Sequence, residues 1–315
     1  MEVLWRWRTK ARAFGLVLSG SVMLGLTASA ADRVRLASYN VENYLLTAAG
    51  TREVKSEAAR EKVVESLRAC AADLLALQEV GGEDALQDLR RRLGRVGLDY
   101  AHHELVRGAD TNIQVALLSR WPITRRQPHV HDSYLVSGRR FRVSRGFLEA
   151  EVKVSSGYSL TVLVAHLKSR RAMAEADEAE MRKQEALLLR KKMEACTAGQ
   201  PRANVVLLGD LNDTKDTEPV RILIGRGGAQ WTDARPAERN GDTGFSPNPR
   251  WQPRTVSWTH YYGVEDSYSR VDYILLHPNT VREWVRAESF IPVVPDWGRG
   301  SDHRPVVVTL EAKDR

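Results

Sequence analysis

The sequence predicts an α/β domain in which two stacked β-sheets are flanked by helices. Short apolar runs, among them Leu160–Ala165 and Val205–Leu208, are typical of strands that are buried on both faces. Segments with helical periodicity separate these runs, which fall into two groups along the chain. No internal repeat, low-complexity tract or linker interrupts residues 33–312. We therefore expect residues 31–315 to form a single domain.

The first thirty residues have the pattern of a secretory signal peptide. Basic residues from Arg6 to Arg12 precede an apolar run of thirteen, Phe14–Leu26, and the small-x-small sequence Ala28-Ser29-Ala30 follows. The run is too short to span a bilayer as a helix. An uncleaved N-terminal anchor is the alternative. We expect cleavage near Ala31, export to the periplasm or the extracellular space, and no membrane span in the mature chain.

Composition narrows the class of protein. The chain has 315 residues, 43% hydrophobic and 28% charged, which is enough for one sizeable core. The formal charge of +7 becomes 7 − 4 + 1 = +4 once residues 1–30 are removed. This surplus suits a phosphate-bearing substrate and equally an ordinary soluble surface. Two cysteines, Cys70 and Cys196, exclude a disulfide scaffold and a thiolate metal site; whether the two pair is left open.

The first third of the chain predicts two strands that end in polar residues. Residues 33–41 form the first strand and lead to Asn40 and Glu42, whose side chains share one side. A helix is expected over 56–70, and a buried strand over 73–79 carries Glu79 at its end. A second helix follows over 83–93. Because open α/β sheets bind ligands at strand ends, Glu79 is a candidate ligand for a hard cation.

The middle third predicts further strands and one long helix. Strands are expected over 113–118 and 160–169, the latter with His166 near its end. Residues 141–154 are interpreted as a strand pair with a kink at Arg145 and Gly146. A charged segment predicts a helix over 171–195. His166 alone is more typical of a hydrogen-bonded structural residue.

Residues 204–213 are the centre of the prediction. The buried strand Val205–Leu208 ends at Gly209, and Asp210 and Asn212 then face one spot because they are two residues apart. A carboxylate and an amide together suit a phosphate, since one accepts a proton while the other donates hydrogen bonds. The alternative is an Asx turn in which both side chains satisfy their own backbone.

The last third supplies a carboxylate and a histidine. A strand over 269–277 buries Asp272, which requires a His or Arg partner. Asp302 and His303 precede a final strand over 306–310. The loop 233–257 mixes basic and aromatic residues, and it either grips nucleic acid by stacking or packs as an ordinary surface loop.

Six motifs stand in the order found in the endonuclease/exonuclease/phosphatase family, which the chain resembles over nearly all of its mature length. They are Asn40-Val-Glu42, Leu77-Gln-Glu79, Ala165-His166-Leu, Gly209-Asp210-Leu-Asn212, Arg270-Val-Asp272-Tyr273 and Ser301-Asp302-His303. The family includes deoxyribonuclease I, abasic-site endonucleases, sphingomyelinases and inositol polyphosphate phosphatases. The resemblance implies a four-layer α/β/β/α sandwich, with two mostly antiparallel sheets face to face and helices outside.

The resemblance also implies a metal site. Glu79 matches the main divalent-metal ligand of the family, with Asn40 and Asp302 beside it and Glu42 as an addition. The expected cofactor is Mg²⁺, with Mn²⁺ or Ca²⁺ as alternatives. Mg²⁺ retains several of its waters, so a sparse set of protein ligands suffices.

The same resemblance implies catalytic roles. Asp210 and Asn212 match residues that orient or deprotonate the attacking water and hold the phosphate. His303 matches the essential histidine, oriented by Asp272, and His166 matches a second histidine. Which of Asp210, His303 and His166 is base and which is acid stays open.

The phosphate contact and the substrate complete the prediction. Arg145 is a further expected phosphate contact. We expect an exported, metal-dependent phosphodiester hydrolase, a nuclease acting on DNA or RNA as a monomer. The alternatives are a phosphatase or a sphingomyelinase-like lipid phosphodiesterase and, more remotely, a non-catalytic protein that binds a phosphate ligand.

Overall fold

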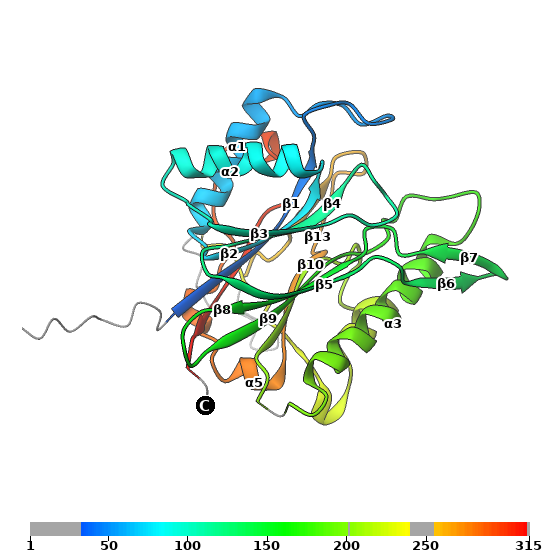
Figure 1. Cartoon of the computed structure of the whole chain (residues 1–315). Coiled ribbons are helices and arrows are strands. Elements are labelled where there is room, and N and C mark those ends of the chain that lie inside the picture. The colour runs from blue at the N-terminus through cyan, green and yellow to red at the C-terminus, as the bar shows by residue number, and fades with distance from the viewer. Residues whose placement is uncertain (1–32, 201, 240–254, 314–315) are drawn as a thin grey trace, which may run out of the picture. The chain divides into compact units, whose positions relative to one another are not determined.

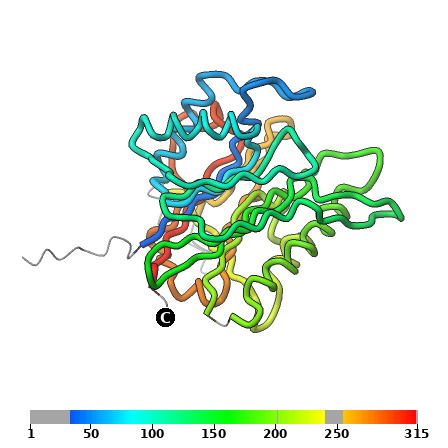
Figure 2. The backbone as a smooth tube through the Cα atoms, in the orientation of Figure 1, coloured from blue at the N-terminus to red at the C-terminus, as the bar shows by residue number. Residues whose placement is uncertain are grey.

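Two β-sheets carry the fold in the computed structural model, which describes residues 33–200, 202–239 and 255–313. The first sheet has five strands, in the order β15 (Val306–Glu311), β1 (Arg33–Tyr44), β2 (Leu74–Val80), β4 (Gln114–Ser119) and β3 (His102–Val106). The second has six, in the order β11 (Thr232–Asp233), β14 (Asp272–Leu276), β10 (Val205–Asp210), β9 (Ser159–His166), β8 (Phe147–Lys153) and β5 (Ile123–His129). The first and last strands of the described chain, blue and red in Figure 2, lie side by side.

Each sheet is mostly antiparallel and contains one parallel pair, which confirms the predicted sheet type. The parallel pairs are β1 with β2 and β9 with β10. Helix α1 (Glu57–Cys70) connects the first pair, and helix α3 (Glu178–Thr197) connects the second. Because parallel strands end at the same edge, each pair brings the polar residues that follow its apolar runs together.

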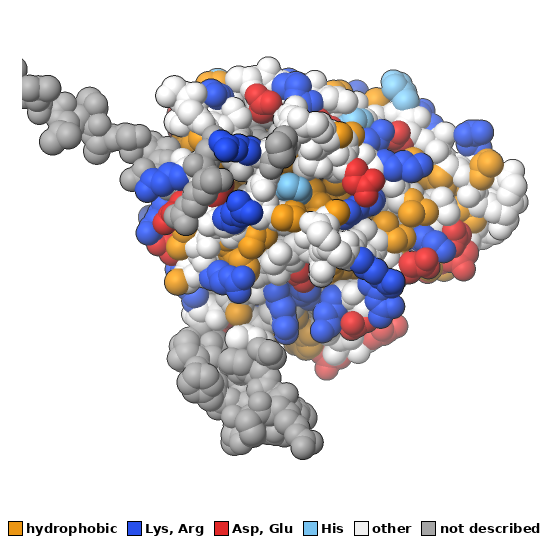
Figure 3. Space-filling view, turned by 90° about the horizontal axis from the view of Figure 1, so that it is seen from below, with side chains coloured by type: hydrophobic (Ala, Val, Ile, Leu, Met, Phe, Trp, Pro, Cys, Tyr) orange, Lys and Arg blue, Asp and Glu red, His pale blue; other side chains and the backbone are white. Residues whose placement is uncertain are grey.

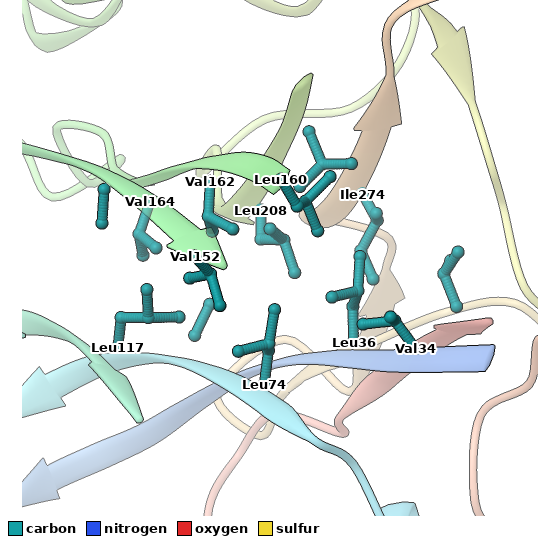
Figure 4. Close-up of a cluster of buried hydrophobic side chains, with 14 of the residues drawn as sticks. Val34, Leu36, Leu74, Leu117, Val152, Leu160, Val162, Val164, Leu208 and Ile274 are labelled. Atoms are coloured by element: carbon teal, nitrogen blue, oxygen red, sulfur yellow. The ribbon is translucent and has the colours of Figure 1, made fainter. Parts of the chain in front are cut away.

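Side chains on the facing sides of the two sheets form the central core. Leu36, Leu74, Leu117, Leu208 and Ile274 meet there, all of them buried (Figure 4). The alternate residues of the same strands face outward into two further apolar layers under the helices. Burial on both faces explains why these strands read as continuous apolar runs.

Helices cover the outer faces of both sheets, which confirms the four-layer α/β/β/α sandwich (Figure 1). Helices α1 and α2 (Glu83–Arg95) pack on the first sheet, and α3 and α4 (Glu218–Ile224) pack on the second. The Ser56 hydroxyl caps α1 by accepting a hydrogen bond from the Ala59 N–H at 3.2 Å. The smaller elements are the hairpins β6 (Ser133–Val136) with β7 (Arg139–Arg142) and β12 (His260–Tyr262) with β13 (Ser267–Ser269), and helix α5 (Pro278–Val281).

Two predicted elements differ from the structure. The long helix begins at Glu178 and not at 171, because the Asp177 carboxylate caps it by accepting from the N–H groups of Ala179 and Glu180. The predicted strand pair over 141–154 is wrong: β7 pairs with β6, whereas β8 pairs with β5 and β9. Gly146, with φ of 66°, separates the two strands and directs them to different partners.

The two cysteines are free, which answers the question of their pairing. Cys70 is the last residue of α1 and is buried against the first sheet, whereas Cys196 lies in the last turn of α3 and is half-buried against the other sheet. Among the described residues, no helix has both the length and the apolar character needed to cross a membrane. The predicted signal peptide and residues 240–254 of the predicted loop lie outside the described residues.

Candidate active site

Polar side chains from both sheets meet where the parallel strands end. Asp210 ends β10, and its register neighbours are His166 on β9 and Asp272 on β14. Asn40, near the end of β1, donates a hydrogen bond from Nδ2 to Asp210 Oδ2 at 3.0 Å. It also approaches Glu79 Oε1 on β2 at 3.4 Å. One amide therefore links carboxylates of the two sheets.

Asp210 is the most heavily contacted of these groups. Its Oδ1 accepts from the Asn212 N–H at 2.8 Å, and its Oδ2 lies 3.3 Å from Asn212 Nδ2. The imidazole Nε2 atoms of His166 and His303 lie 3.5 and 3.8 Å from Oδ2. Burial raises the pKa of Asp210 to about 6, although the nearby His303 opposes the shift. The Asx-type contact from Asn212 is thus present as part of the same cluster.

His303 is held by a buried carboxylate. Its Nδ1 lies 2.8 Å from Asp272 Oδ2. The Thr259 hydroxyl oxygen accepts the N–H groups of Val271 and Asp272, both at 3.1 Å, which fixes the start of β14. Burial alone would lower the pKa of His303, but Asp272 and Asp210 raise it well above its usual range. The imidazole is therefore a proton donor at neutral pH.

A second group of carboxylates surrounds the end of β1. Glu79 Oε2 accepts the Asn43 N–H at 2.9 Å, and Glu42 Oε2 accepts the Asp302 N–H at 3.2 Å. Glu42, Asn43 and Glu79 all have positive φ, at 43°, 49° and 65°. The register of β1 with β2 shifts at this point. Non-glycine residues in the left-handed region at a strand irregularity are typical of functional sites, where the irregularity changes the direction of the side chains.

The donor set near Glu79 fits a hard divalent cation. Glu79 and Glu42 offer carboxylate oxygens. Within the described ranges, Asn40 Oδ1 accepts only the Glu42 N–H, and Asn43 Oδ1 is buried without a partner. Burial and the nearby Asp302 raise the pKa of Glu42. Several oxygen acceptors lie close together here, and one of them is buried and unpaired. A bound cation would satisfy that oxygen and offset the negative charge of the carboxylates.

His166 and Arg145 border the other side of Asp210. His166 is 1% exposed, and its Nδ1 has no partner among the described residues. Burial, and then the charge of Arg145, lowers the pKa of His166 well below its usual range, so this imidazole is neutral. Arg145 is also buried, and its Nε has no hydrogen-bond partner in the part of the chain that the structure describes. A buried guanidinium with a free N–H donor suits an anionic ligand.

The predicted site residues thus lie close together and form two groups, one around Asp210 and one made of Glu42 and Asp302. Contacts join Asn40, Glu79, Asn212, His166, His303 and Asp272 to Asp210 directly or through one neighbour. Glu42 and Asp302 are joined to each other, and Asp302 Oδ1 lies 3.8 Å from His303 Nε2. Arg145 is linked to these residues by electrostatics alone, because its charge lowers the pKa of His166.

Residues 37–303 match the model of the Endonuclease/Exonuclease/phosphatase family. The chain belongs to this family. Members of the family are phosphoric diester hydrolases and generally depend on a metal. No curated protein sequence matches the chain.

Solved structures share the family fold with this chain. An endonuclease/exonuclease/phosphatase from Bacteroides vulgatus has a TM-score of 0.59 and 17% identity, covering 89% of this chain and 99% of that one. The human Nocturnin catalytic domain with bound sulfate has a TM-score of 0.60 and 17% identity, covering 89% and 94%. Sphingomyelinase C from Streptomyces griseocarneus has a TM-score of 0.58 and 18% identity, covering 88% and 99%. These identities establish the fold alone.

Two residues at this site, Lys55 and His260, were not predicted from the sequence. Lys55 is 9% exposed, and its Nζ donates to the Glu42 carbonyl oxygen at 2.6 Å. Its segment reads as a charged surface, so nothing in the sequence signals a buried cation. His260 lies with its ring centroid 4.5 Å from that of His303 and its Nε2 3.5 Å from Asp302 Oδ2. No spacing rule links positions 260 and 303.

Proposed function

We propose that this family member is an exported, divalent-metal-dependent phosphodiesterase that cleaves nucleic acid. One observation carries the proposal: a continuous set of contacts links Glu79, Asp210 and His303, which come from three separate parts of the chain. Family membership supplies the reaction class.

Glu79 would hold the cation, with Asn40, Asp302 and Glu42 around it. Mg²⁺ is the expected ion, and Mn²⁺ or Ca²⁺ fits the same oxygen donors. When bound, the ion stabilises negative charge on the phosphoryl oxygens and the leaving oxygen.

The chain's own groups would divide the proton transfers. Asp210, with its pKa of about 6, is ionised at neutral pH and is placed to take a proton from the attacking water. The protonated His303, held by Asp272, would donate to the phosphoryl group or the leaving oxygen. This assignment makes Asp210 the base and His303 the acid.

Other residues would hold the phosphate. Asn212 offers its amide beside Asp210, and Arg145 offers a guanidinium whose Nε has no hydrogen-bond partner among the described residues. The neutral His166, beside Asp210, would add a further hydrogen-bonding group for the phosphate. The bound sulfate in the human Nocturnin domain supports an anion site in this fold.

The residues around the site favour nucleic acid as the substrate. The hairpin of β12 and β13 exposes Tyr262 and Tyr268, at 44% and 56%, as surfaces on which bases can stack. Glu265 and Asp266 in its turn oppose insertion into a lipid layer. On the face shown in Figure 3, Lys and Arg side chains lie among Asp and Glu side chains, so this face is not uniformly basic.

Metal-dependent cleavage tests the activity. Residues 31–315 would be incubated with plasmid DNA, structured RNA, sphingomyelin and inositol phosphates, with Mg²⁺ or with EDTA. We expect cleavage of nucleic acid with Mg²⁺ alone, and its loss in Glu79→Gln. The matched control Glu175→Gln changes an exposed glutamate outside the site and should keep full activity. Hydrolysis of lipid or inositol phosphate alone would transfer the proposal to that substrate, and binding without hydrolysis would remove it.

Export is tested separately. The full chain would be expressed in a bacterium with a Sec pathway, and the N-terminus of the protein in the periplasm and medium would be sequenced. We expect a chain that starts near Ala31. An uncleaved chain in the membrane fraction would support the anchor instead.

A further inference from the structure

We propose that His260, Asp302 and His303 form a second cation site, which takes a transition-metal ion such as Zn²⁺, Co²⁺ or Mn²⁺ rather than Mg²⁺. The site adjoins the carboxylates around Glu79, shares Asp302 with them and differs from them in its two imidazole donors. The inference concerns metal binding and does not depend on the catalytic roles proposed above.

The backbone places the two histidines opposite each other. His260 on β12 and His303 form an antiparallel bridge. Its hydrogen bonds run from the Tyr261 N–H to the Asp302 carbonyl oxygen at 2.9 Å and from the Arg304 N–H to the Thr259 carbonyl oxygen at 2.6 Å. Directly opposed residues of antiparallel strands hold their side chains side by side. The arrangement is therefore fixed by main chain and not by rotamer choice alone.

The spacing of the donor atoms suits a metal ion. Asp302 Oδ2 lies 3.5 Å from His260 Nε2, and Asp302 Oδ1 lies 3.8 Å from His303 Nε2. One donor atom from each of the three residues can be chosen so that all lie within 4.8 Å of one another. Donors about 2.0–2.1 Å from a tetrahedral ion are separated by roughly 3.4 Å. Small side-chain adjustments would close the observed spacing to that value.

His303 already has the outer partner that a metal-bound histidine needs. Asp272 Oδ2 lies 2.8 Å from its Nδ1 on the side away from Asp302. Metal binding releases the proton from Nε2, and a carboxylate in this position holds the remaining proton on Nδ1 and makes Nε2 a better ligand. Asp302 is 42% exposed at its side chain, which gives an ion a path from solvent.

The donor types select the metal. Two imidazoles and one carboxylate favour Zn²⁺, Co²⁺ or Mn²⁺, whereas Mg²⁺ prefers oxygen donors and keeps its waters. An ion bound here would occupy His303 Nε2, the atom that faces Asp210. Binding at this site therefore removes that nitrogen from proton transfer.

Cobalt absorption spectroscopy tests the site without any activity assay. The mature chain would be titrated with Co²⁺ in the presence of excess Mg²⁺, and visible d–d absorption would report ordered coordination. We expect saturation at one Co²⁺ per chain. Affinity should fall at least roughly tenfold in His260→Gln. Binding should persist in Glu79→Gln, because that carboxylate belongs to the oxygen site.

Two further variants keep the test decisive. His103→Gln is the matched control, since His103 Nε2 lies 3.2 Å from Glu83 Oε1 in a His–carboxylate pair elsewhere on the surface. It should bind Co²⁺ as the wild type does. His260→Cys should retain the ion and add a sulfur-to-cobalt charge-transfer band, which shows that position 260 is a ligand. Unchanged binding in a folded His260→Gln variant, or bound Co²⁺ without that band in His260→Cys, would overturn the inference.

Discussion

Asp210→Asn should abolish hydrolysis and yet stabilise the folded protein at pH 8. The carboxylate is 1% exposed, and burial raises its pKa from 3.8 to about 6. A shift of about 2 units, at about 1.4 kcal/mol per unit, means that the ionised group costs about 3 kcal/mol in the folded state. The asparagine removes that cost while keeping the shape of the side chain, although its NH₂ group replaces one of the two oxygens that accept hydrogen bonds, which reduces the gain.

The stability of Asp210→Asn relative to the wild type should increase as the pH rises. Below about pH 4 the carboxyl is protonated in both folded and unfolded chains, so the variant gains nothing from removing its charge. The advantage grows as pH rises through 4 to 6 and is complete above 6. Asp210 also stabilises the charged His303, so the net gain is smaller than 3 kcal/mol.

Urea unfolding of both proteins from pH 4 to pH 8, followed by circular dichroism, measures this difference. We expect the free energy of unfolding of Asp210→Asn, relative to wild type, to increase with pH and to be positive at pH 8. A variant that is less stable at pH 8, or whose difference from wild type is independent of pH, would refute the reasoning about the buried carboxylate.

Four further results are expected. Asp272→Asn should lower kcat about 10²- to 10⁴-fold with little change in KM, because the imidazole loses the group that orients it; a rise in KM alone would contradict this role. Arg145→Gln should lower kcat/KM about 10- to 100-fold, because a charged hydrogen-bond donor to the phosphate is lost; an unchanged kcat/KM would remove Arg145 from phosphate binding. Lys55→Met should cost about 1–3 kcal/mol of stability in EDTA and less in Mg²⁺, because the ion replaces the missing positive charge beside Glu42; an equal loss in both buffers would count against a cation there. The kcat/KM of the wild type should fall as pH drops through about 6, where Asp210 gains its proton; a flat profile between pH 5 and 7 would exclude it as the base.

The sequence predicted the parts of the fold that are buried on both faces. Val205–Leu208 and Leu160–Ala165 read as strands because every residue in them except the half-buried Thr161 meets an apolar layer. Edge strand β5 was not predicted, since its sequence, Ile-Thr-Arg-Arg-Gln-Pro-His, is largely exposed and polar. A strand without a buried face carries no hydrophobic signal.

The site could be predicted where a polar residue directly follows a buried strand. Asp210 and Glu79 have that position, and the family motifs extend it to His303. Lys55 and His260 could not be predicted, because their places depend on the left-handed turn at Glu42 and on a two-residue bridge to His303. Such features are set by tertiary packing and leave no periodicity in the chain.

The central claim is that Glu79, Asp210 and His303 surround one cation and one phosphodiester. Anomalous diffraction from crystals soaked with Mn²⁺ and a non-hydrolysable phosphorothioate dinucleotide tests it most directly. We expect a manganese peak at coordination distance from the Glu79 carboxylate, with the phosphorothioate group between Asn212 and His303. Manganese bound away from Glu79, or a dinucleotide bound on a different face, would contradict the claim.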